Sequence, residues 1–243
     1  MRWLLGGELH PGGEALTRRA FELIQLGADD RLLDVGSGDG ATVALAAREY
    51  GCRATGVEYG AAAVEDARAR AAELGPGDRV EFLPGDAGAL PLGDAMFDVV
   101  ISECSLCTFA DKARAVGEMR RVLRTGGRLA LSDVVAEVER LPDELRGALG
   151  AIACVGEALP PQAHRELLEN AGFEVLAEED RTTDALEMAD RIADRVRGAK
   201  VLGLDDLFPL DGGAGAALQL LGDARAAIAD GRIGYALVAA RRA

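Results

Sequence analysis

The residues best suited to bind a small charged ligand are concentrated in one segment, Arg31–Gly40, which reads RLLDVGSGDG. Its three glycines are Gly36, Gly38 and Gly40. Glycines let the backbone turn sharply and let a ligand approach the main chain closely. Asp34 and Asp39 add negative charge beside the turn, so the segment favours a ligand with positive charge over a pyrophosphate.

Spacing alone also allows a dinucleotide. In the pattern G-x-G-x-x-G/A, the two glycines would be Gly36 and Gly38, with Ala41 in the third position. Glu58 follows a second apolar stretch, Ala54–Val57, where an acidic side chain accepts both ribose hydroxyls of an adenosine in nucleotide-binding folds. The spacing therefore indicates a ligand that contains adenosine. The negative charge of the segment favours a positively charged ligand over a dinucleotide.

The elements that position these residues are predicted from hydrophobic periodicity. Leu32–Val35 reads as a short buried strand, and the helix-forming sequence ATVALAARE begins at Ala41. Further strands are predicted over residues 54–57, 80–83, 97–102, 128–133, 173–176 and 235–240. Further helices are predicted over residues 14–26, 61–74, 111–123, 142–149, 161–171, 183–201 and 218–229. This alternation implies a doubly wound sheet of parallel strands.

Glycine-rich connections separate these elements. We expect Gly27 to be the C′ residue of the first helix, residues 124–127 to form a turn, and residues 203–215 to form a loop. The chain then divides into an N-terminal arm and helix over 1–30, a ligand-binding core over 31–134, and a region over 135–243. That last region holds a helical cap and the remaining strands of the same domain.

The series LDVGSGDG, followed by GVE, resembles motif I and the acidic end of the second strand in class I methyltransferases that use S-adenosylmethionine. The resemblance extends over Leu32–Asp133 and includes RVLRTGGRLALSD. It implies a Rossmann-like α/β fold, with a seven-stranded, mostly parallel sheet, helices on both faces, a helical C-terminal cap and an antiparallel last strand. It also implies S-adenosylmethionine as the cofactor.

The same resemblance assigns cofactor contacts to particular positions. Asp34 is expected near the amino group of the cofactor, Glu58 at the ribose, and Asp86 with the Ala87 N–H at the adenine. An aspartate that caps a turn is the alternative for Asp86. The full set expected to contact the cofactor is Asp34, Gly36, Ser37, Gly38, Asp39, Gly40, Glu58, Tyr59, Asp86, Ala87 and Glu103.

The second chemically distinctive group is the cysteines, namely Cys52, Cys104, Cys107 and Cys154. The elements S-E-C-x-x-C, RVLRTGGRLALSDVVAE and A-C-V-G-E-A-L resemble arsenite methyltransferases, within a group that includes small-molecule methyltransferases of quinone biosynthesis. Cys104 and Cys154 match two cysteine positions of that family, and soft centres such as trivalent arsenic favour thiolate ligands. The resemblance implies Cys104 and Cys154 as arsenic ligands, Cys107 as a third candidate, and Glu103 beside the reacting methyl.

Three departures leave the acceptor open. Glu103 stands where the family usually has asparagine, Ile152–Ala153 replaces Gly-Glu, and no cysteine precedes Cys52. A small organic acceptor with a reacting oxygen, nitrogen or carbon is the alternative, with the cysteines as small buried side chains. The general-base candidates are then Glu103, Asp133, Glu157 and His164.

The net charge and the length of the apolar runs limit which partners the protein can have. A net charge of −14 over 243 residues disfavours nucleic acid as a substrate. No apolar run is long enough to span a membrane, and the apolar N-terminal run is too short for a signal peptide. We therefore expect a cytoplasmic protein that acts on a small molecule, with thiols rather than disulfides.

The same residues also bear on metal binding and on two other function classes. Zinc at the C-x-x-C pair would need two further ligands, and the two histidines are not in a ligand-spaced pair, so no metal is expected. A nicotinamide-dependent oxidoreductase and a cofactor-binding sensor without activity are the other function classes. No feature of the sequence predicts an oligomeric state.

Overall fold

The computed structural model describes residues 9–74, 77–141, 143, 145–146, 155–204, 207–208, 210 and 212–243. The chain forms two compact units, which are described separately below. One consists of Met1–Gly13, Val134–Pro161 and Asp180–Ala236, and the other of Glu14–Asp133, Gln162–Glu179 and Leu237–Ala243. The second unit holds the glycine-rich segment. The three-part division expected from the sequence stays a prediction.

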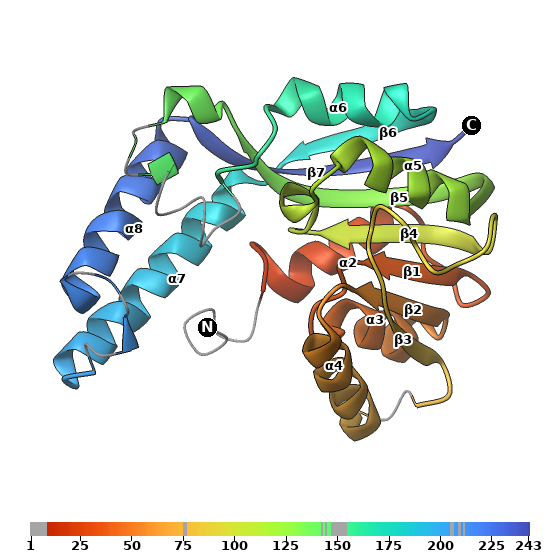
Figure 1. Cartoon of the computed structure of the whole chain (residues 1–243), viewed down its shortest axis with the longest axis horizontal. Helices are drawn as coiled ribbons and strands as arrows, with labels where there is room; N and C mark the ends of the chain where they lie inside the picture. Colours follow the sequence, from red (N-terminus) through yellow and green to blue (C-terminus); the bar gives the residue numbers. More distant parts are fainter. Residues whose placement is uncertain are drawn as a thin grey trace. The chain divides into compact units, whose positions relative to one another are not determined.

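The strands form one seven-stranded sheet in the order β3-β2-β1-β4-β5-β7-β6 (Figure 1). Their bounds are β1 Arg31–Val35, β2 Arg53–Glu58, β3 Val80–Pro84, β4 Phe97–Glu103, β5 Leu123–Ala136, β6 Phe173–Asp180 and β7 Ile233–Arg242. The pairs β1–β2, β1–β4, β2–β3 and β4–β5 are parallel, whereas the arrow of β7 points opposite to that of β4 in Figure 1. The predicted Rossmann-like, mostly parallel sheet is confirmed.

The two central strands explain where a ligand can bind. All residues of β1 after Arg31, and all of β4 before Glu103, are buried, as expected for parallel strands covered on both faces. The strand order reverses between β1 and β4. In open α/β sheets, ligands bind beyond the carboxyl ends of the strands at such a switch point.

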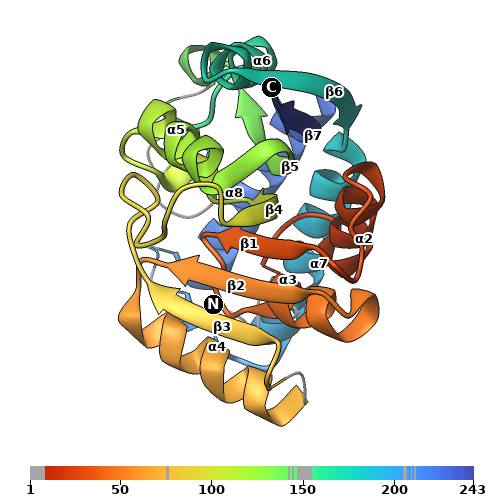
Figure 2. The same ribbon diagram turned by 90° about the vertical axis from the view of Figure 1, so that its right-hand side faces the viewer.

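The helices are α2 Gly13–Leu23, α3 Ala41–Leu45, α4 Ala61–Leu74, α5 Lys112–Val122, α6 Pro161–Asn170, α7 Thr182–Val201 and α8 Gly213–Ala229. A π-helical turn, Ala46–Tyr50, continues α3, and a short 3₁₀ turn, Leu106–Thr108, follows β4. In Figure 2, α5 lies on one side of the sheet and α2 and α3 lie on the other. Helices on both faces are therefore confirmed.

Each unit has its own apolar core. In the unit that holds the glycine-rich segment, Leu33 of β1, Val100 of β4 and Leu131 of β5 pack with Met119 of α5 and Phe173 of β6. In the other unit, α7 and α8 pack through a separate cluster, which consists of Val196, Ala199, Phe208, Ala214 and Ala217. No helix in the described parts of the chain is both long enough and apolar enough to cross a bilayer.

The end of α2 corrects one prediction. The helix ends at Leu23, and Gln25 takes the left-handed conformation with φ 51°. The Leu26 N–H donates to the Phe21 carbonyl at 2.9 Å, and the Gln25 N–H donates to the Glu22 carbonyl at 3.0 Å. These are the bonds of a Schellman motif, so Gln25 is the C′ residue and the prediction of Gly27 was wrong.

Two other boundaries differ from expectation. Residues 124–127, predicted as a turn, belong to β5, where Gly126 has a φ of +75° and the pairing with β4 shifts register. Helix α8 begins at Gly213 instead of residue 218. Most of the predicted helix 142–149 and part of the predicted loop 203–215 lie outside the described residues.

Candidate functional site

The glycine-rich turn follows β1 and closely contacts the segment after β4. The Gly36 and Ser37 N–H groups donate to the Val57 carbonyl at 2.8 and 3.1 Å. Gly36 has a φ of +81°, and a Cβ there would lie 2.5 Å from Ser105 Oγ. Gly40 has a φ of +76°, and a Cβ there would meet the Phe82 ring. Both positions therefore require glycine for conformation and for space.

Four carboxylates gather around this turn. Asp34 is only 3% exposed. Burial, followed by the negative charges of Glu103, Glu58 and Asp39, raises the pKa of Asp34 well above its usual value. A cationic group placed here would relieve that repulsion.

Asp39 and Glu58 are bonded to backbone N–H groups in and near the turn. Asp39 pairs with Arg70 of α4 and accepts the Ala41 N–H at 3.2 Å. Glu58 accepts the N–H of Gly38 through Oε2 and that of Gly60 through Oε1, each at 3.0 Å. Asp39 and Glu58 thus fix the backbone of the turn and of the segment after β2.

Ser37 contributes an unsatisfied hydroxyl at the turn. Its Oγ is buried and has no hydrogen-bond partner within the described residues. A buried polar group without a partner costs about 1–3 kcal/mol, and such groups in native proteins call for a partner. A ligand at this turn could supply it.

A pocket of about 430 Å³ lies beside the turn and contains part of the predicted set. The predicted residues that line it are Gly36, Glu58, Tyr59, Asp86 and Ala87. The other lining residues are Val35, Val57, Gly85, Ser105, Thr108, Phe109 and Ala110. The six remaining predicted residues, which do not line this pocket, are Asp34, Ser37, Gly38, Asp39, Gly40 and Glu103. The wall formed by Ser105, Thr108, Phe109 and Ala110 was not among the predicted cofactor contacts, although its position directly after β4 was the available signal.

Tyr59 and Asp86 are both exposed residues of this pocket. The Tyr59 side chain is 81% exposed. Asp86 is also exposed, and its Oδ1 accepts the Gly88 N–H at 2.8 Å, which is the turn-capping arrangement that sequence analysis gave as the alternative. One oxygen of Asp86 is therefore bonded within its own turn.

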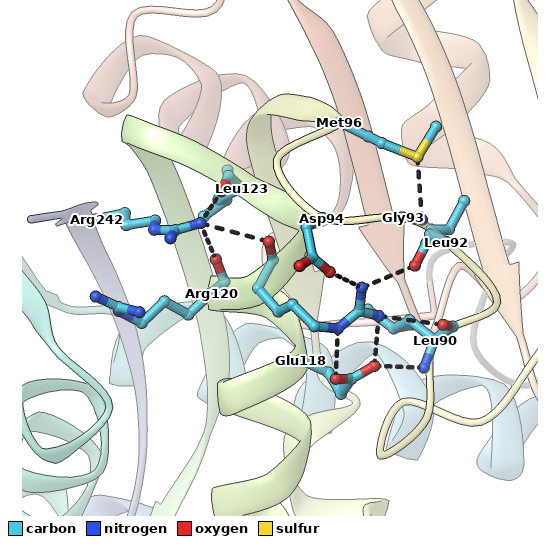
Figure 3. Close-up of polar contacts among 10 residues, drawn as sticks. Leu90, Leu92, Gly93, Asp94, Met96, Glu118, Arg120, Leu123 and Arg242 are labelled. Atoms are coloured by element: carbon cyan, nitrogen blue, oxygen red, sulfur yellow. Dashed lines mark hydrogen bonds and ion pairs between the residues drawn. The ribbon is translucent and has the colours of Figure 1, made fainter.

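The segment that carries Asp86 and Ala87 is anchored on α5 (Figure 3). Arg121 donates to the Leu92 carbonyl at 2.8 Å and to both oxygens of Glu118 at 2.7 Å. Glu118 in turn accepts the Leu90 N–H at 2.9 Å. The hydrogen bond to Arg121 lowers the pKa of Glu118, so the anchor remains charged near neutral pH.

Hydrogen bonds from other segments hold the end of β4 and the residues that follow it. The Glu103 carboxylate accepts hydrogen bonds from the hydroxyls of Thr17 and Thr42. The Ser105 hydroxyl donates to the Gly36 carbonyl at 3.2 Å. The Cys107 N–H donates to Asp133 Oδ2 at 3.0 Å. Asp133 is itself 1% exposed.

The described cysteines differ in accessibility. Cys52 and Cys107 are buried, and burial raises the pKa of Cys52 to about 11, so Cys52 is a structural thiol. Cys104 is half-buried, has a φ of 50°, and donates its N–H to the Ser132 carbonyl at 2.7 Å. Cys154 lies outside the described residues.

The remaining base candidates lie in other surroundings. His164 on α6 is 3% exposed, and its Nδ1 has no hydrogen-bond partner within the described residues. Burial lowers its pKa to about 4, so the imidazole is neutral at pH 7. Glu157 is exposed and belongs to the other unit.

Comparison with known proteins identifies the family. A family model described as a methyltransferase domain matches residues 26–172. The chain is also 33% identical over 236 residues to 27-O-demethylrifamycin SV methyltransferase of Amycolatopsis mediterranei, covering 93% of this chain and 82% of that protein. The chain belongs to the methyltransferase family. It is a class I enzyme that uses S-adenosylmethionine, as its sequence motifs predicted, and not a nicotinamide oxidoreductase.

Two further proteins similar to this chain have other named activities. Arsenite methyltransferase of Halobacterium salinarum is 36% identical over 179 residues, covering 70% of this chain and 44% of that protein. The crystal structure of the [4+2]-cyclase SpnF has 28% sequence identity and a TM-score of 0.76, and the alignment covers 99% of this chain and 91% of that one.

The residues around the methyltransferase's glycine-rich turn fit S-adenosylmethionine chemically. The cofactor carries a sulfonium and an ammonium group, and the turn is surrounded by carboxylates with a buried Asp34 among them. The buried Ser37 hydroxyl has no partner in the part of the chain that the structure describes, and Gly36 and Gly40 keep the backbone free of side chains.

Proposed function

We propose that the protein transfers the methyl group of S-adenosylmethionine to a hydroxyl group of a small organic acceptor. The observation that carries this proposal is the similarity to the rifamycin methyltransferase, which extends over nearly the whole of both chains. The arsenite methyltransferase matches over less than half of its own length. The departures at Glu103 and Ile152–Ala153 also favour an organic acceptor.

The cofactor's sulfonium supplies an already activated methyl group, so the chain's task is orientation and exclusion of water. In the proposed arrangement, Gly36, Ser37 and Gly38 line the methionine part, and Asp34 faces its ammonium group. Glu58 accepts the ribose hydroxyls. Asp86 and the Ala87 N–H contact the adenine, which accords with their position in the pocket beside the turn.

The segment after β4 then faces the reacting methyl. Glu103 ends β4 and Cys104 follows it, and the Ser105 hydroxyl next to them donates to the Gly36 carbonyl of the glycine-rich turn. Because the Glu103 carboxylate already accepts hydroxyl hydrogen bonds, its role is a fixed negative charge. His164 is buried in α6 and neutral at pH 7, so we assign it no role in catalysis.

A soft, thiol-bound substrate such as arsenite is the second candidate. Two observations favour this candidate. Cys104, which directly follows β4, is half-buried, and the chain is similar in sequence to the Halobacterium enzyme. In that case Cys104 and Cys154 bind the arsenic, with Cys107 as a third ligand. We expect Cys104→Ser and Cys154→Ser each to lower arsenite-dependent methylation below detection, because a serine hydroxyl is a much poorer ligand for soft arsenic than the thiolate it replaces. Cys52→Ser is the matched control and should retain the rate.

The decisive experiment is a transfer assay with labelled S-adenosylmethionine over arsenite, thiols and hydroxyl-bearing polyketides and phenols. O-methylated product identified by mass spectrometry would support the first candidate. Methylated arsenic that disappears in both cysteine variants would replace it by the second. Binding of S-adenosylhomocysteine without methyl transfer to any acceptor would contradict both and favour a sensor or a cyclase.

A further inference from the structure

The Glu103 carboxylate is held by hydroxyls from two different helices. Thr17 Oγ1 of α2 lies 3.1 Å from Glu103 Oε1 and 3.2 Å from Oε2. Thr42 Oγ1 of α3 donates to Oε2 at 2.7 Å. Thr17 is 1% exposed and Thr42 is 9% exposed, so water competes little for either bond.

The contacts of Thr17 and Thr42 with Glu103 lie close to the glycine-rich turn, where the cofactor is proposed to bind. Thr42 lies in the first turn of α3, two residues after Gly40 of the glycine-rich turn. The charge of Glu103 is also near enough to Asp34 to oppose its ionisation. Glu103 and Asp34 therefore both lie near the glycine-rich turn, whose residues Gly36, Ser37 and Gly38 line the methionine part of the cofactor in the proposed function.

A carboxylate at the end of a strand has several rotamers, and a free one would turn toward water or toward a nearby donor. Two buried hydroxyl donors remove that freedom, and hydrogen bonds to a charged group are worth about 1.5–3 kcal/mol each. The arrangement resembles a preorganised anionic site, in which the orientation is fixed before the ligand arrives.

We propose that Thr17 and Thr42 are positioning residues, which hold the Glu103 carboxylate toward the ammonium group of the bound cofactor. This inference rests on the proposed function. It makes α2, which precedes the sheet in the chain, a structural part of the cofactor site. A cofactor bound against Glu103 then stabilises α2 through Thr17.

The test compares ligands that differ at the methionine end. S-adenosylmethionine and S-adenosylhomocysteine both carry the ammonium group, whereas 5′-methylthioadenosine lacks it and keeps the adenosine. We expect Thr17→Val and Thr42→Val each to weaken the first two ligands about tenfold by calorimetry, and to leave 5′-methylthioadenosine within about twofold. Thr17→Ser retains the hydroxyl and should restore binding.

Thr182→Val is the matched control, because it also removes a hydrogen-bonded hydroxyl, which here accepts the Tyr235 N–H at 3.3 Å and lies in the other unit. Circular dichroism verifies that each variant is folded. Hydrogen exchange provides a second readout: S-adenosylhomocysteine should protect the amides of α2 in the wild type and not in Thr17→Val.

The outcomes separate the two proposals. If the wild type binds neither cofactor form, the proposed function fails. If the wild type binds both forms, and the valine variants either bind as tightly or lose all three ligands equally, the positioning role of Thr17 and Thr42 is overturned.

Discussion

The carboxylates around the glycine-rich turn have the same chemistry but different tasks, because their hydrogen bonds differ. Asp39 is neutralised by Arg70, and Glu58 caps two backbone N–H groups. Glu103 is oriented by threonine hydroxyls. Asp34 is buried beside these charges, and its pKa is raised. Asp34 is therefore the carboxylate most sensitive to a cationic ligand.

This sensitivity predicts proton release on cofactor binding. In the ligand-free protein the raised pKa of Asp34 makes its carboxyl harder to ionise than an ordinary aspartate, and an ammonium group beside it lowers that pKa again. Where the pH lies between the pKa values of the free and bound states, binding releases a proton, and by linkage the affinity rises with pH over that interval. Calorimetry of S-adenosylhomocysteine in phosphate and in Tris, between pH 6 and 8, measures the proton count.

Asp34→Asn keeps the size of the side chain and removes its titration, so its binding should be weaker and should release fewer protons. Asp98→Asn is the control, because Asp98 is buried near the opposite end of β4 and accepts the Arg31 N–H. Equal proton release in the wild type and in Asp34→Asn would refute this assignment.

At the scale of elements, the connection between β3 and β4 shows how an irregular segment is made rigid. Two side chains of α5, Glu118 and Arg121, bond its backbone from Leu90 to Leu92 (Figure 3). Arg242 of β7 donates to the carbonyls of Arg120 and Arg121 at the end of the same helix. The helix and its anchored segment thus form one support for the pocket wall that contains Asp86.

We expect Glu118→Gln to weaken S-adenosylhomocysteine binding about tenfold, because it removes one partner of a partly buried ion pair and loosens the segment beside Asp86. The specific readout is base discrimination. If Asp86 accepts the exocyclic amine of adenine, the variant should lose preference for S-adenosylhomocysteine over S-inosylhomocysteine. Arg124→Gln breaks a neighbouring ion pair, Arg124–Asp98, and should change neither affinity nor preference. Unchanged discrimination in Glu118→Gln would exclude the anchoring role.

For the whole molecule, the sequence predicted those features that depend on a short run of neighbouring residues or on the order of motifs. The apolar runs around Leu33 and Val100 predicted central strands, because parallel strands are buried on both faces. The motif order predicted the sheet and the cofactor. The end of α2 at Gln25 was missed because a residue other than glycine takes the left-handed conformation.

The contacts that distant segments make could not be predicted in the same way. Thr17 and Glu103 are separated by 86 positions, and neither residue type signals the other. The wall of Ser105, Thr108, Phe109 and Ala110 lines the pocket because β4 ends beside β1. Such contacts follow from the strand order and need the folded structure.

The free energy of unfolding should depend on pH through the buried side chain of His164. His164 is 3% exposed on α6, and the charged groups that act on it are Glu178 of β6, which raises its pKa, and Lys112 of α5, which lowers it. Burial dominates and lowers the folded-state pKa to about 4 from 6.5. Above pH 6.5 the imidazole is neutral in both states and its titration has no effect on stability. As the pH falls from about 6.5 to about 4, the unfolded state takes up the proton first, and the free energy of unfolding decreases by up to about 3 kcal/mol.

Urea unfolding at pH 7.5, 6.5, 5.5 and 4.5 measures this decline. His164→Leu fills a similar volume without a titrating group, so its free energy of unfolding should fall less steeply between pH 6.5 and 4.5. His10→Gln removes the other histidine of the chain and should keep the wild-type slope. The carboxylates are common to all three proteins, so the difference between slopes isolates His164. A slope in His164→Leu equal to that of the wild type would mean that the loss of stability in acid comes from those carboxylates alone.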